Sequence, residues 1–492
     1  MTKRPRPRVR AVAAVLAPLA ILLALLSWGL SSPPGSSPDD DYHLASIWCA
    51  AGEVDGRCEA ATDPDERFVP PGVRKASVCY AFRSESAACP LAEGEMIAFD
   101  RGNWLTGAYP PVFYAVMNLF VTEDVAFSVV LMRSANAVLY VGVLTALFFL
   151  LPRQKRPPLV WGAAVTAVPL AMFLIPSVNP SSWAVLSATG LWVAVWGFMT
   201  TPGRRAWLLA GLAGLLLLLG AGARSDAAVY GVIAMLAGAT IAVRRDRAYV
   251  LRLLVPAGLS VVAALFFFTA GQSAVVSAGT AAGDQGLAAS TLVFANLKAL
   301  PELWAGVFGT SPLGWLDTEM PGAVWVTALT LFGAVVFWGL RSGTWGKWVA
   351  LAGVAASLTI IPLYILVHDG VVAGEGGVQS RYVYPLVIML AGIALVGGIR
   401  PDLGLSRLQM IVAACSLVLA NGVALHVNIR RYVTGDDVLG VDLDANVEWW
   451  WNAPVSPMAL WAAGSVAFLV GIAALTFAAW RPRIEPTHTG VS

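Results

Sequence analysis

Long apolar segments recur along almost the whole chain, and they limit the folds that it can adopt. The chain has 492 residues, of which 58% are hydrophobic and only 13% are charged. An apolar run of about 20 residues is the length that an α-helix needs to cross a bilayer. The sequence therefore predicts an all-α polytopic membrane protein with about 12 transmembrane helices. The predicted spans are residues 11–30, 127–151, 159–176, 182–200, 205–222, 226–243, 250–270, 323–340, 346–366, 383–399, 407–429 and 457–480.

The charged residues predict an orientation for these spans. With twelve spans, the basic start MTKRPRPRVR and the loops and tail on its side carry 20 of the 32 Lys and Arg residues, but only three of the 30 acidic residues. Cytoplasmic segments are enriched in Lys and Arg, so both termini are expected in the cytoplasm. No clear cleavage site follows the first span, which favours an uncleaved anchor over a signal peptide. We expect a multi-pass protein of the cell membrane that contacts membrane lipid, and nothing indicates nucleic-acid binding.

The same topology divides the chain into parts. Residues 1–30 form a basic N-terminus and a first anchor, 31–126 a long extracytoplasmic loop, 127–480 the transmembrane bundle and 481–492 a cytoplasmic tail. The further outer loops of the bundle are 271–322, 367–382 and 430–456. Long loops on one side predict that the functional residues lie on the outer face. No P-loop or dinucleotide fingerprint indicates ATP or NAD, so we expect either a substrate that is already activated outside the cytoplasm or a gradient.

Cysteines are concentrated in the first outer loop. Four of the five, Cys49, Cys58, Cys79 and Cys89, lie there. On an oxidising face of the membrane they predict two disulfides, for which three pairings are open. Sequential pairing, Cys49 with Cys58 and Cys79 with Cys89, is the simplest. A zinc site is the competing interpretation, and it is disfavoured because no histidine lies near the later pair.

The segment Ser-Pro-Asp-Asp-Asp-Tyr-His follows the first span directly. Pro38 followed by acids is typical of a first helical turn, where the helix dipole favours carboxylates. The dipole accounts for one or two acids but not for three adjacent ones, which repel each other. On a helix His43 lies three residues after Asp40 and four after Asp39, so it can meet either carboxylate. We interpret Asp39 or Asp40 as a general base and His43 as its orienting partner. Asp39 and Asp41 could instead hold a divalent metal, but we assign no metal and no other cofactor.

Three arginines lie on the predicted outer side, where the positive-inside bias disfavours them. An arginine embedded in a membrane is costly and normally faces a partner. For Arg133 we expect that partner to be another helix, and for Arg224 to be Asp226 or a lipid headgroup. Arg381 is expected to bind a phosphate, which a guanidinium can grip with two hydrogen bonds. The segment Asn179-Pro180-Ser181 is interpreted as a helix-capping turn.

Several of these elements together resemble a bacterial membrane family known as domain of unknown function 2142. Pro38-Asp39-Asp40-x-x-His43 resembles its P-D-E-x-x-H element after the first span, and Tyr109-Pro110-Pro111-Val112-Phe113-Tyr114 resembles its aromatic-flanked P-P element. Asn179-Pro180 resembles its N-P turn, and Arg381-Tyr382 with Pro385 its R-Y-x-x-P element. The elements span residues 38 to 385 in the family's order. This chain has Asp40 where the family pattern usually has Glu, which leaves open which acid acts.

That family is similar in layout to the GT-C membrane glycosyltransferases, which take sugars from polyprenyl-phosphate carriers. The resemblance implies transfer of a sugar from a polyprenyl-phosphate-linked donor to a cell-envelope glycan acceptor on the outer face. It implies that Asp39 or Asp40 is the base, with His43 beside it, and that Arg381 and Arg224 bind the donor phosphate. Tyr382 and Asp41 are the further expected substrate-binding residues.

Two alternatives stand beside this hypothesis. A transporter or flippase of lipid-linked glycan should carry ionisable residues near the middle of its spans and broken helices there. The middle parts of the predicted spans are nearly free of charge, while acids crowd the outer side, which favours the enzyme. The other alternative is a non-catalytic scaffold of envelope assembly.

Overall fold

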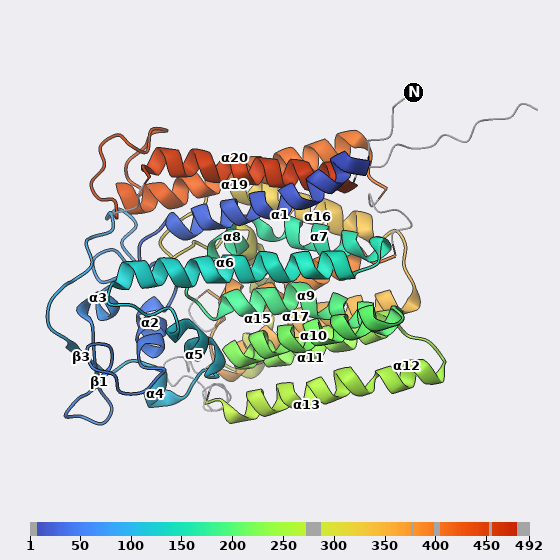
Figure 1. The fold of residues 1–492 in the computed structure, drawn as a ribbon, viewed down its shortest axis with the longest axis horizontal. Helices are drawn as coiled ribbons and strands as arrows, with labels where there is room; N and C mark the ends of the chain where they lie inside the picture. Colours follow the sequence, from blue (N-terminus) through green and yellow to red (C-terminus); the bar gives the residue numbers. More distant parts are fainter. Residues whose placement is uncertain (1–6, 272–286, 375–377, 398–403, 452–454, 480–492) are drawn as a thin grey trace, which may run out of the picture.

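The computed structural model describes residues 7–271, 287–374, 378–397, 404–451 and 455–479. Long helices run side by side along one axis and form a bundle (Figure 1). The short elements of residues 40–118 gather at one end of this bundle (Figure 1). One small antiparallel sheet of strand order β1-β2-β3 lies among them, with Phe68 paired to both Glu59 and Ala98.

The bundle helices are α1 (Pro7–Leu30), α6 (Val125–Leu150), α9 (Ser181–Thr200), α10 (Arg204–Ala223), α11 (Ser225–Ile241), α13 (Leu254–Thr269), α16 (Gly322–Gly339), α17 (Trp345–His368), α18 (Ser380–Ala394), α19 (Arg407–Val433) and α20 (Pro457–Ala479). The shorter elements are α2 (Asp40–Trp48), β1 (Glu59–Ala60), β2 (Arg67–Val69), α3 (Pro71–Arg74), β3 (Ile97–Phe99), α4 (Asn103–Thr106), α5 (Val112–Asn118), η1 (Arg153–Lys155), α7 (Arg156–Val165), η2 (Ala167–Ala171), α8 (Met172–Leu174), α12 (Arg247–Arg252), α15 (Ala289–Ala305) and η3 (Gly306–Phe308).

The predicted all-α polytopic class is confirmed, and every predicted span is largely helical where it is described. Within the described part of the chain, nine helices are long and apolar enough to cross a membrane, or ten if one bent pair counts as a single span. The expected number of about 12 is higher because α11 and α18 have only 17 and 15 residues. The third predicted span is the bent pair.

The bent pair breaks the helix in the middle of the predicted span 159–176. Helix α7 ends at Val165, and the segment Ala167–Leu174 leaves it at an angle of 85°. Pro169 has no backbone N–H to donate and Val168 has non-helical dihedral angles, so the ladder of helical hydrogen bonds is interrupted. The Tyr384 hydroxyl of α18 donates to the Thr166 carbonyl oxygen at 2.6 Å and so satisfies one of the freed groups.

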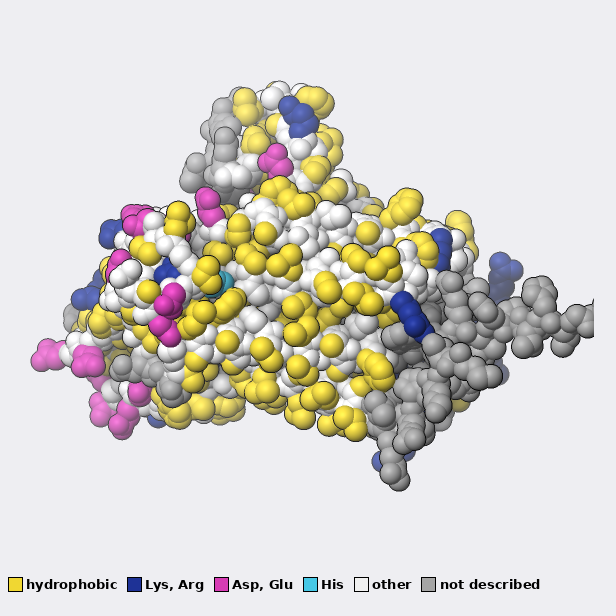
Figure 2. Space-filling view, turned by 90° about the horizontal axis from the view of Figure 1, so that it is seen from above, with side chains coloured by type: hydrophobic (Ala, Val, Ile, Leu, Met, Phe, Trp, Pro, Cys, Tyr) yellow, Lys and Arg dark blue, Asp and Glu magenta, His cyan; other side chains and the backbone are white. Residues whose placement is uncertain are grey.

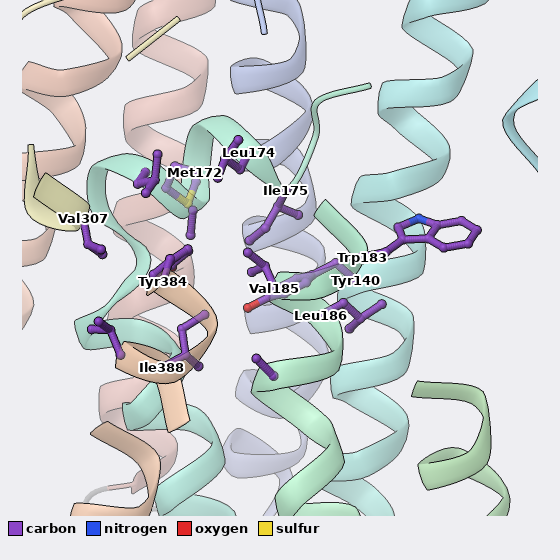
Figure 3. Close-up of a cluster of buried hydrophobic side chains, with 14 of the residues drawn as sticks. Tyr140, Met172, Leu174, Ile175, Trp183, Val185, Leu186, Val307, Tyr384 and Ile388 are labelled. Carbon is purple, nitrogen blue, oxygen red and sulfur yellow. The ribbon is translucent and has the colours of Figure 1, made fainter. Parts of the chain in front are cut away.

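The hydrophobic core surrounds this break. Met172, Leu174 and Ile175 follow the bend, and they pack with Trp183 of α9 and Tyr384 of α18 among other apolar side chains (Figure 3). These side chains are buried. Because a break in hydrocarbon is tolerated only where other protein covers the backbone, the packing of α9 and α18 is what permits it.

Charged side chains separate toward the two ends of the bundle. Asp and Glu gather at the end that carries the loop of residues 31–126, and much of the surface between the ends is apolar (Figure 2). The apolar belt and the spanning-length helices identify a multi-pass membrane protein that contacts lipid.

A buried ion pair joins the loops that contain Tyr80 and Asp317 to the bundle. Arg431, in the last turn of α19, donates from Nη2 to Asp317 Oδ2 at 2.9 Å, and both side chains are almost completely buried. The same guanidinium donates to the carbonyl oxygens of Tyr80 and Ser86 in the first loop. The Phe82 N–H donates to Asp317 Oδ2 at 3.3 Å. One cation therefore joins three segments that are far apart in sequence.

Both predicted disulfides are present, and their pairing is the sequential one. Cys49 is bonded to Cys58, and Cys79 to Cys89. Cys49 is also the C-terminal cap of α2. Cys415 of α19 is a free thiol.

The disulfides predict a simple labelling result. After denaturation without a reducing agent, an alkylating reagent should add one group to the protein, at Cys415, and after reduction it should add five. Intact-mass measurement checks both numbers, and a Cys415→Ser variant should take none before reduction. Three or more labelled thiols in the unreduced protein would contradict the presence of both disulfides.

The buried ion pair predicts a large loss of stability when one partner is removed. Asp317→Asn leaves Arg431 buried without a counter-charge, and the expected cost is about 3–5 kcal/mol in the free energy of unfolding. Unfolding in detergent, followed by circular dichroism, measures it. The double variant Asp317→Asn/Arg431→Met should cost less than the sum of the single variants, because neither charge then remains unpaired. The exposed Asp436→Asn serves as the control and should change little.

Candidate functional site

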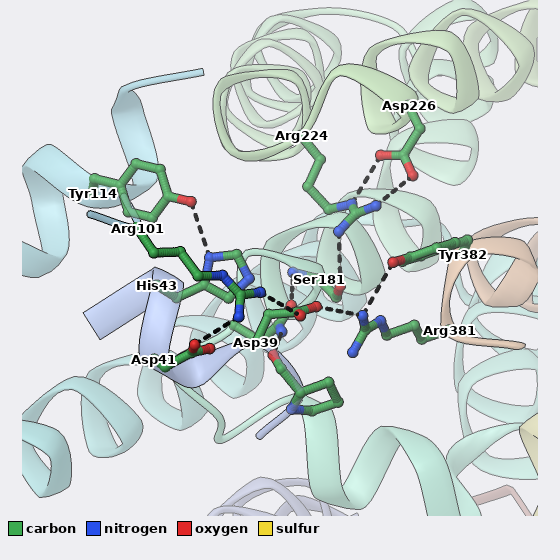
Figure 4. Close-up of polar contacts among 12 residues, drawn as sticks. Asp39, Asp41, His43, Arg101, Tyr114, Ser181, Arg224, Asp226, Arg381 and Tyr382 are labelled. Atoms are coloured by element: carbon green, nitrogen blue, oxygen red, sulfur yellow. Dashed lines mark hydrogen bonds and ion pairs between the residues drawn. The ribbon is translucent and has the colours of Figure 1, made fainter. Parts of the chain in front are cut away.

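Asp39 is the central residue of the candidate site. It precedes α2 and has a left-handed backbone, with φ of 58°. Asp is one of the few residues that tolerates this conformation. Its side chain makes no capping hydrogen bond to α2, although an Asp at this position normally does. The carboxylate is therefore free for other partners and faces two arginines (Figure 4).

Arg381 provides the shorter of these contacts. It lies in the first turn of α18, and its Nη2 donates to Asp39 Oδ2 at 2.7 Å and to the Tyr382 hydroxyl at 3.1 Å. Its side chain is only 6% exposed. The Nε and Nη1 atoms of Arg381 are buried and have no hydrogen-bond partner. A buried guanidinium with unused donors is a strong candidate for binding an anion.

The start of α18 is fixed by close contact with η3. Ser380 and Ser311 share a hydrogen bond of 2.9 Å between their hydroxyls. Gly306 packs against both serines so closely that a Cβ atom there would collide with their oxygens. These contacts set the position from which Arg381 reaches Asp39.

Arg224 lies on the other side of Tyr382. Its Nε and Nη2 donate to the two carboxylate oxygens of Asp226 at 2.9 and 2.8 Å, so the expected protein partner is confirmed. Its Nη1 is 3.4 Å from the Ser181 hydroxyl. The Tyr382 ring lies between two cations, with guanidinium carbons of Arg224 and Arg381 at 4.9 and 5.0 Å from its centre.

Four helices begin at this cluster. Asp39 immediately precedes α2, Arg224 immediately precedes α11, Ser181 is the first residue of α9, and Arg381 is in the first turn of α18. The N-terminus of a helix carries a partial positive charge and unpaired backbone N–H groups. The cluster therefore has a more positive potential than its formal charges alone would give, and this favours anions.

Arg101 is a member of the site that the sequence analysis did not find. Its guanidinium donates to Asp41 Oδ2 at 2.7 Å and to Asp39 Oδ1 at 3.3 Å, and its side chain is 49% exposed. An arginine in a polar loop carries no sequence signal of such a role. Arg101 bridges the two carboxylates that were considered as metal ligands. Among the described residues, no group of three or more His, Cys, Asp or Glu side chains is arranged to hold a metal ion.

His43 does not hydrogen-bond either carboxylate, contrary to the expectation from helical spacing. Its Nδ1 is 3.0 Å from the Tyr114 hydroxyl of α5, and its ring packs edge-on against Tyr109. The spacing argument failed for Asp39 because this residue lies outside α2 with a left-handed backbone, so its side chain leaves the helical face. The carboxylate of Asp40, the first residue of α2, accepts a hydrogen bond from the Ser37 N–H instead. Burial lowers the pKa of His43 to about 3, although the charge of Asp39 opposes this, and the imidazole is neutral.

Asp40 lies apart from the arginines of the cluster. It is fully buried, and its Oδ2 accepts a hydrogen bond from the Ser37 N–H at 3.0 Å. Burial raises its pKa to about 7, although the charge of Arg133 opposes the rise. The carboxyl of Asp39 behaves differently. Burial alone would raise its pKa, but the charges of Arg381 and Arg101 outweigh burial and hold the pKa below 3.8.

Arg133 and Asn179 hold the backbone on which Asp39 sits. Arg133 of α6 donates to the carbonyl oxygens of Gly29, Ser32 and Pro33, where α1 ends. Its partner is thus the exit of another helix, as expected. Asn179 donates from Nδ2 to the Pro38 carbonyl oxygen at 2.9 Å, next to Asp39. Its Oδ1 accepts the Ser181 N–H at 2.9 Å, as in a helix-capping turn.

Residues 22–390 match the family described as "Predicted membrane protein (DUF2142)". The chain belongs to this family. No curated protein and no solved structure matches the chain.

The four sequence elements that resemble the DUF2142 pattern meet at one place in the fold. Asp39 of the first element pairs with Arg381 of the fourth. Asn179 of the third holds the Pro38 carbonyl of the first. Tyr109 of the second packs against His43, and the Arg224 guanidinium carbon lies 5.7 Å from the centre of its ring. Segments separated by up to 342 positions thus form a single cluster on the acidic end of the molecule.

The raised pKa of Asp40 predicts a pH-dependent stability. A carboxyl group whose pKa is 3.8 when unfolded and about 7 when folded stabilises the fold in its protonated form, and this contribution falls as pH rises through that range. Asp40→Asn keeps a neutral side chain. The free energy of unfolding of this variant, relative to wild type, should therefore rise by up to about 4 kcal/mol from pH 4 to pH 8.

Unfolding in detergent at a series of pH values measures this difference. Taking the difference from wild type removes the contribution of His43, which has the opposite sign. The matched control is Asp39→Asn. The pKa of Asp39 is lowered in the folded protein, so the carboxyl group is ionised in both states well above 3.8, and the difference for this variant should stay constant from pH 5 to pH 8. A constant difference for Asp40→Asn would show that Asp40 is ionised in the folded protein.

Proposed function

We propose that this DUF2142 protein is a membrane glycosyltransferase that moves a sugar from a polyprenyl-phosphate donor to a cell-envelope glycan. The observation that carries the proposal is the unused hydrogen-bonding capacity of Arg381. Its buried Nε and Nη1 have no partner, beside a carboxylate that is 33% exposed. An anion-binding cation next to an accessible base is the combination that transfer from a phosphate leaving group requires.

The site's place in the molecule supports a lipid-linked donor. The cluster lies at the end of the bundle where the first outer loop packs (Figure 1). A polyprenyl phosphate places its phosphate at the membrane surface and its chain among the apolar helices. The donor would bring its own leaving group, so no nucleotide site is needed.

The reaction assigns a role to each side chain. The acceptor hydroxyl attacks the anomeric carbon, its proton passes to the carboxylate of Asp39, and the bond between that carbon and the phosphate oxygen breaks. The polyprenyl phosphate leaves with the bonding electrons and gains one negative charge. Arg381 stabilises that charge, assisted by Arg224 and by the N-termini of α9, α11 and α18. Tyr382 fixes Arg381 through its hydroxyl.

Asp40, Asp41 and His43 then act through the position of Asp39. Asp40 and His43 are buried residues of α2. The carboxylates of Asp41 and Asp39 both accept hydrogen bonds from Arg101. A divalent metal is not needed for any of these steps.

The orientation is part of the proposal. We place the site outside the cytoplasmic face of the cell membrane, with both termini in the cytoplasm. Two observations support this: basic residues predominate in the segments on the side of the N-terminus, and both disulfides are at the other end. Disulfides persist in oxidising compartments.

A transporter of lipid-linked glycan is the second candidate, because one span is broken. Discontinuous helices form the substrate sites of many transporters, and the bend of 85° between α7 and the segment Ala167–Leu174 is such a break. Against this, the buried charged side chains among the described residues lie in loops or near helix ends, apart from Arg133. Arg133 is fully occupied by carbonyl oxygens and the Ser36 hydroxyl.

A transfer assay in detergent separates the two candidates, because no compartment exists there for transport. The assay follows radiolabel from the host's lipid-linked sugars into glycan isolated from a strain that lacks this gene. Wild-type protein should transfer label. Asp39→Asn should lower the initial rate by about 10²–10⁴, the usual contribution of a general base.

Glu95→Gln is the matched control. It makes the same acid-to-amide change at an exposed position of the same loop and should keep the wild-type rate. Transfer by Asp39→Asn at the wild-type rate would refute the assignment of the base. An inactive wild-type protein that moves labelled lipid across proteoliposome membranes would favour the transporter.

A further inference from the structure

The guanidinium of Arg381 has two edges that can bind an anion with a pair of hydrogen bonds. One edge is formed by Nε and Nη2, and the other by Nη1 and Nη2, so Nη2 belongs to both. Both N–H groups of Nη2 already have partners, the Asp39 carboxylate at 2.7 Å and the Tyr382 hydroxyl at 3.1 Å. The unused donors, Nε and Nη1, are therefore on different edges. A phosphate that takes either edge with two bonds must displace a partner from Nη2.

Electrostatics decides which partner leaves. The hydroxyl of Tyr382 is neutral and can turn to donate to a phosphate, whereas the carboxylate of Asp39 repels it. Two anions on one buried cation are disfavoured, because each lowers the attraction that remains for the other. The remaining formal charges give no surplus for a second anion, because Arg224 is paired with Asp226 and Arg101 is paired with Asp41 and Asp39.

We propose that the phosphate of the donor competes with Asp39 for Arg381, so that donor binding breaks the ion pair and frees the carboxylate to act as the base. This inference rests on the proposed function and adds the order of events to it. Before the donor binds, Asp39 is held by Arg381 and is a weak base. After the donor binds, the phosphate neutralises Arg381, and the basicity of Asp39 increases at the moment when an acceptor can be used.

Arg101 keeps the released carboxylate in place. It binds Asp39 Oδ1, the oxygen that Arg381 does not use, at 3.3 Å. Its side chain is half exposed, so it can follow a movement of Asp39 without a large loss of packing. Asp39 precedes α2 without capping it, so its side chain can turn without breaking a hydrogen bond of the helix.

The competition gives a binding result that is separate from catalysis. Removing the carboxylate should tighten the binding of a phosphate, although the same change is expected to slow transfer strongly. Asp39→Asn is a suitable variant because Asn also tolerates the left-handed backbone at this position. Asp39→Gly removes the carboxylate in a second way, and glycine adopts a φ of 58° without strain.

The experiment titrates purified full-length protein in detergent with undecaprenyl phosphate, and measures the bound fraction by native mass spectrometry. Asp39→Asn and Asp39→Gly should each bind it about tenfold more tightly than wild type, the effect expected when a like charge within a few ångströms is removed. Arg381→Gln should bind it much more weakly. Glu95→Gln is the control for a general change in net charge and should match wild type.

Undecaprenol, which has the same chain without the phosphate, should bind equally to all variants. Inorganic phosphate added in excess should compete with undecaprenyl phosphate more strongly in Asp39→Asn than in wild type. This result shows that the competition is for the phosphate group and not for the lipid chain.

The outcomes separate the two proposals. If undecaprenyl phosphate binds to wild type and is lost in Arg381→Gln, but neither Asp39 variant binds it more tightly, the competition is refuted and the donor site stands. If undecaprenyl phosphate binds no better than undecaprenol to any variant, the donor site itself is refuted, and the competition with it.

Discussion

The end of α1 is held by Arg133, and the position of the whole site depends on it. The last carbonyl groups of a helix have no partners within the helix, and in an apolar environment they must be satisfied by another group. One guanidinium from α6 satisfies this need by donating hydrogen bonds to the carbonyl oxygens of Gly29, Ser32 and Pro33. The chain therefore leaves the bundle along one fixed path. Asn179 then fixes Pro38, and the following residue, Asp39, reaches Arg381 on a helix that begins more than 300 positions later.

The cluster has a balanced formal charge. Three arginines, Arg101, Arg224 and Arg381, are paired with three aspartates, Asp39, Asp41 and Asp226. The balance lets the cationic groups remain buried without a bound ligand, since an unpaired buried charge is expensive. It also means that an anion can be bound only by exchange with a carboxylate or with the help of the helix dipoles. The affinity of the site for an anion is therefore lower, but the site is stable when no anion is bound.

Much of this architecture could be predicted from sequence, because hydropathy and charge report burial in a membrane directly. The helical segments follow from such patterns, and the four cysteines of residues 31–126 predict two disulfides, of which the sequential pairing was the simplest of three. The break at Ala167–Ala171 was not predicted, because its residues are as apolar as those of a continuous span, although Pro169 is a sequence signal for it. The pairing of His43 with a carboxylate was wrong because helical spacing does not apply to Asp39, whose backbone is left-handed. Arg101 was missed because tertiary contacts alone define its role.

The disulfide at the end of α2 affects the order in which the parts of the site come together. Cys49 caps the helix whose other end carries Asp39, and its bond to Cys58 closes a short loop against that helix. Bonds of this kind form in oxidising compartments. During synthesis, α1 and the first loop are made long before α18. With the proposed orientation, α2 can therefore be tied down before Arg381 exists, and the last helices of the bundle then dock onto a loop that oxidation has already shaped.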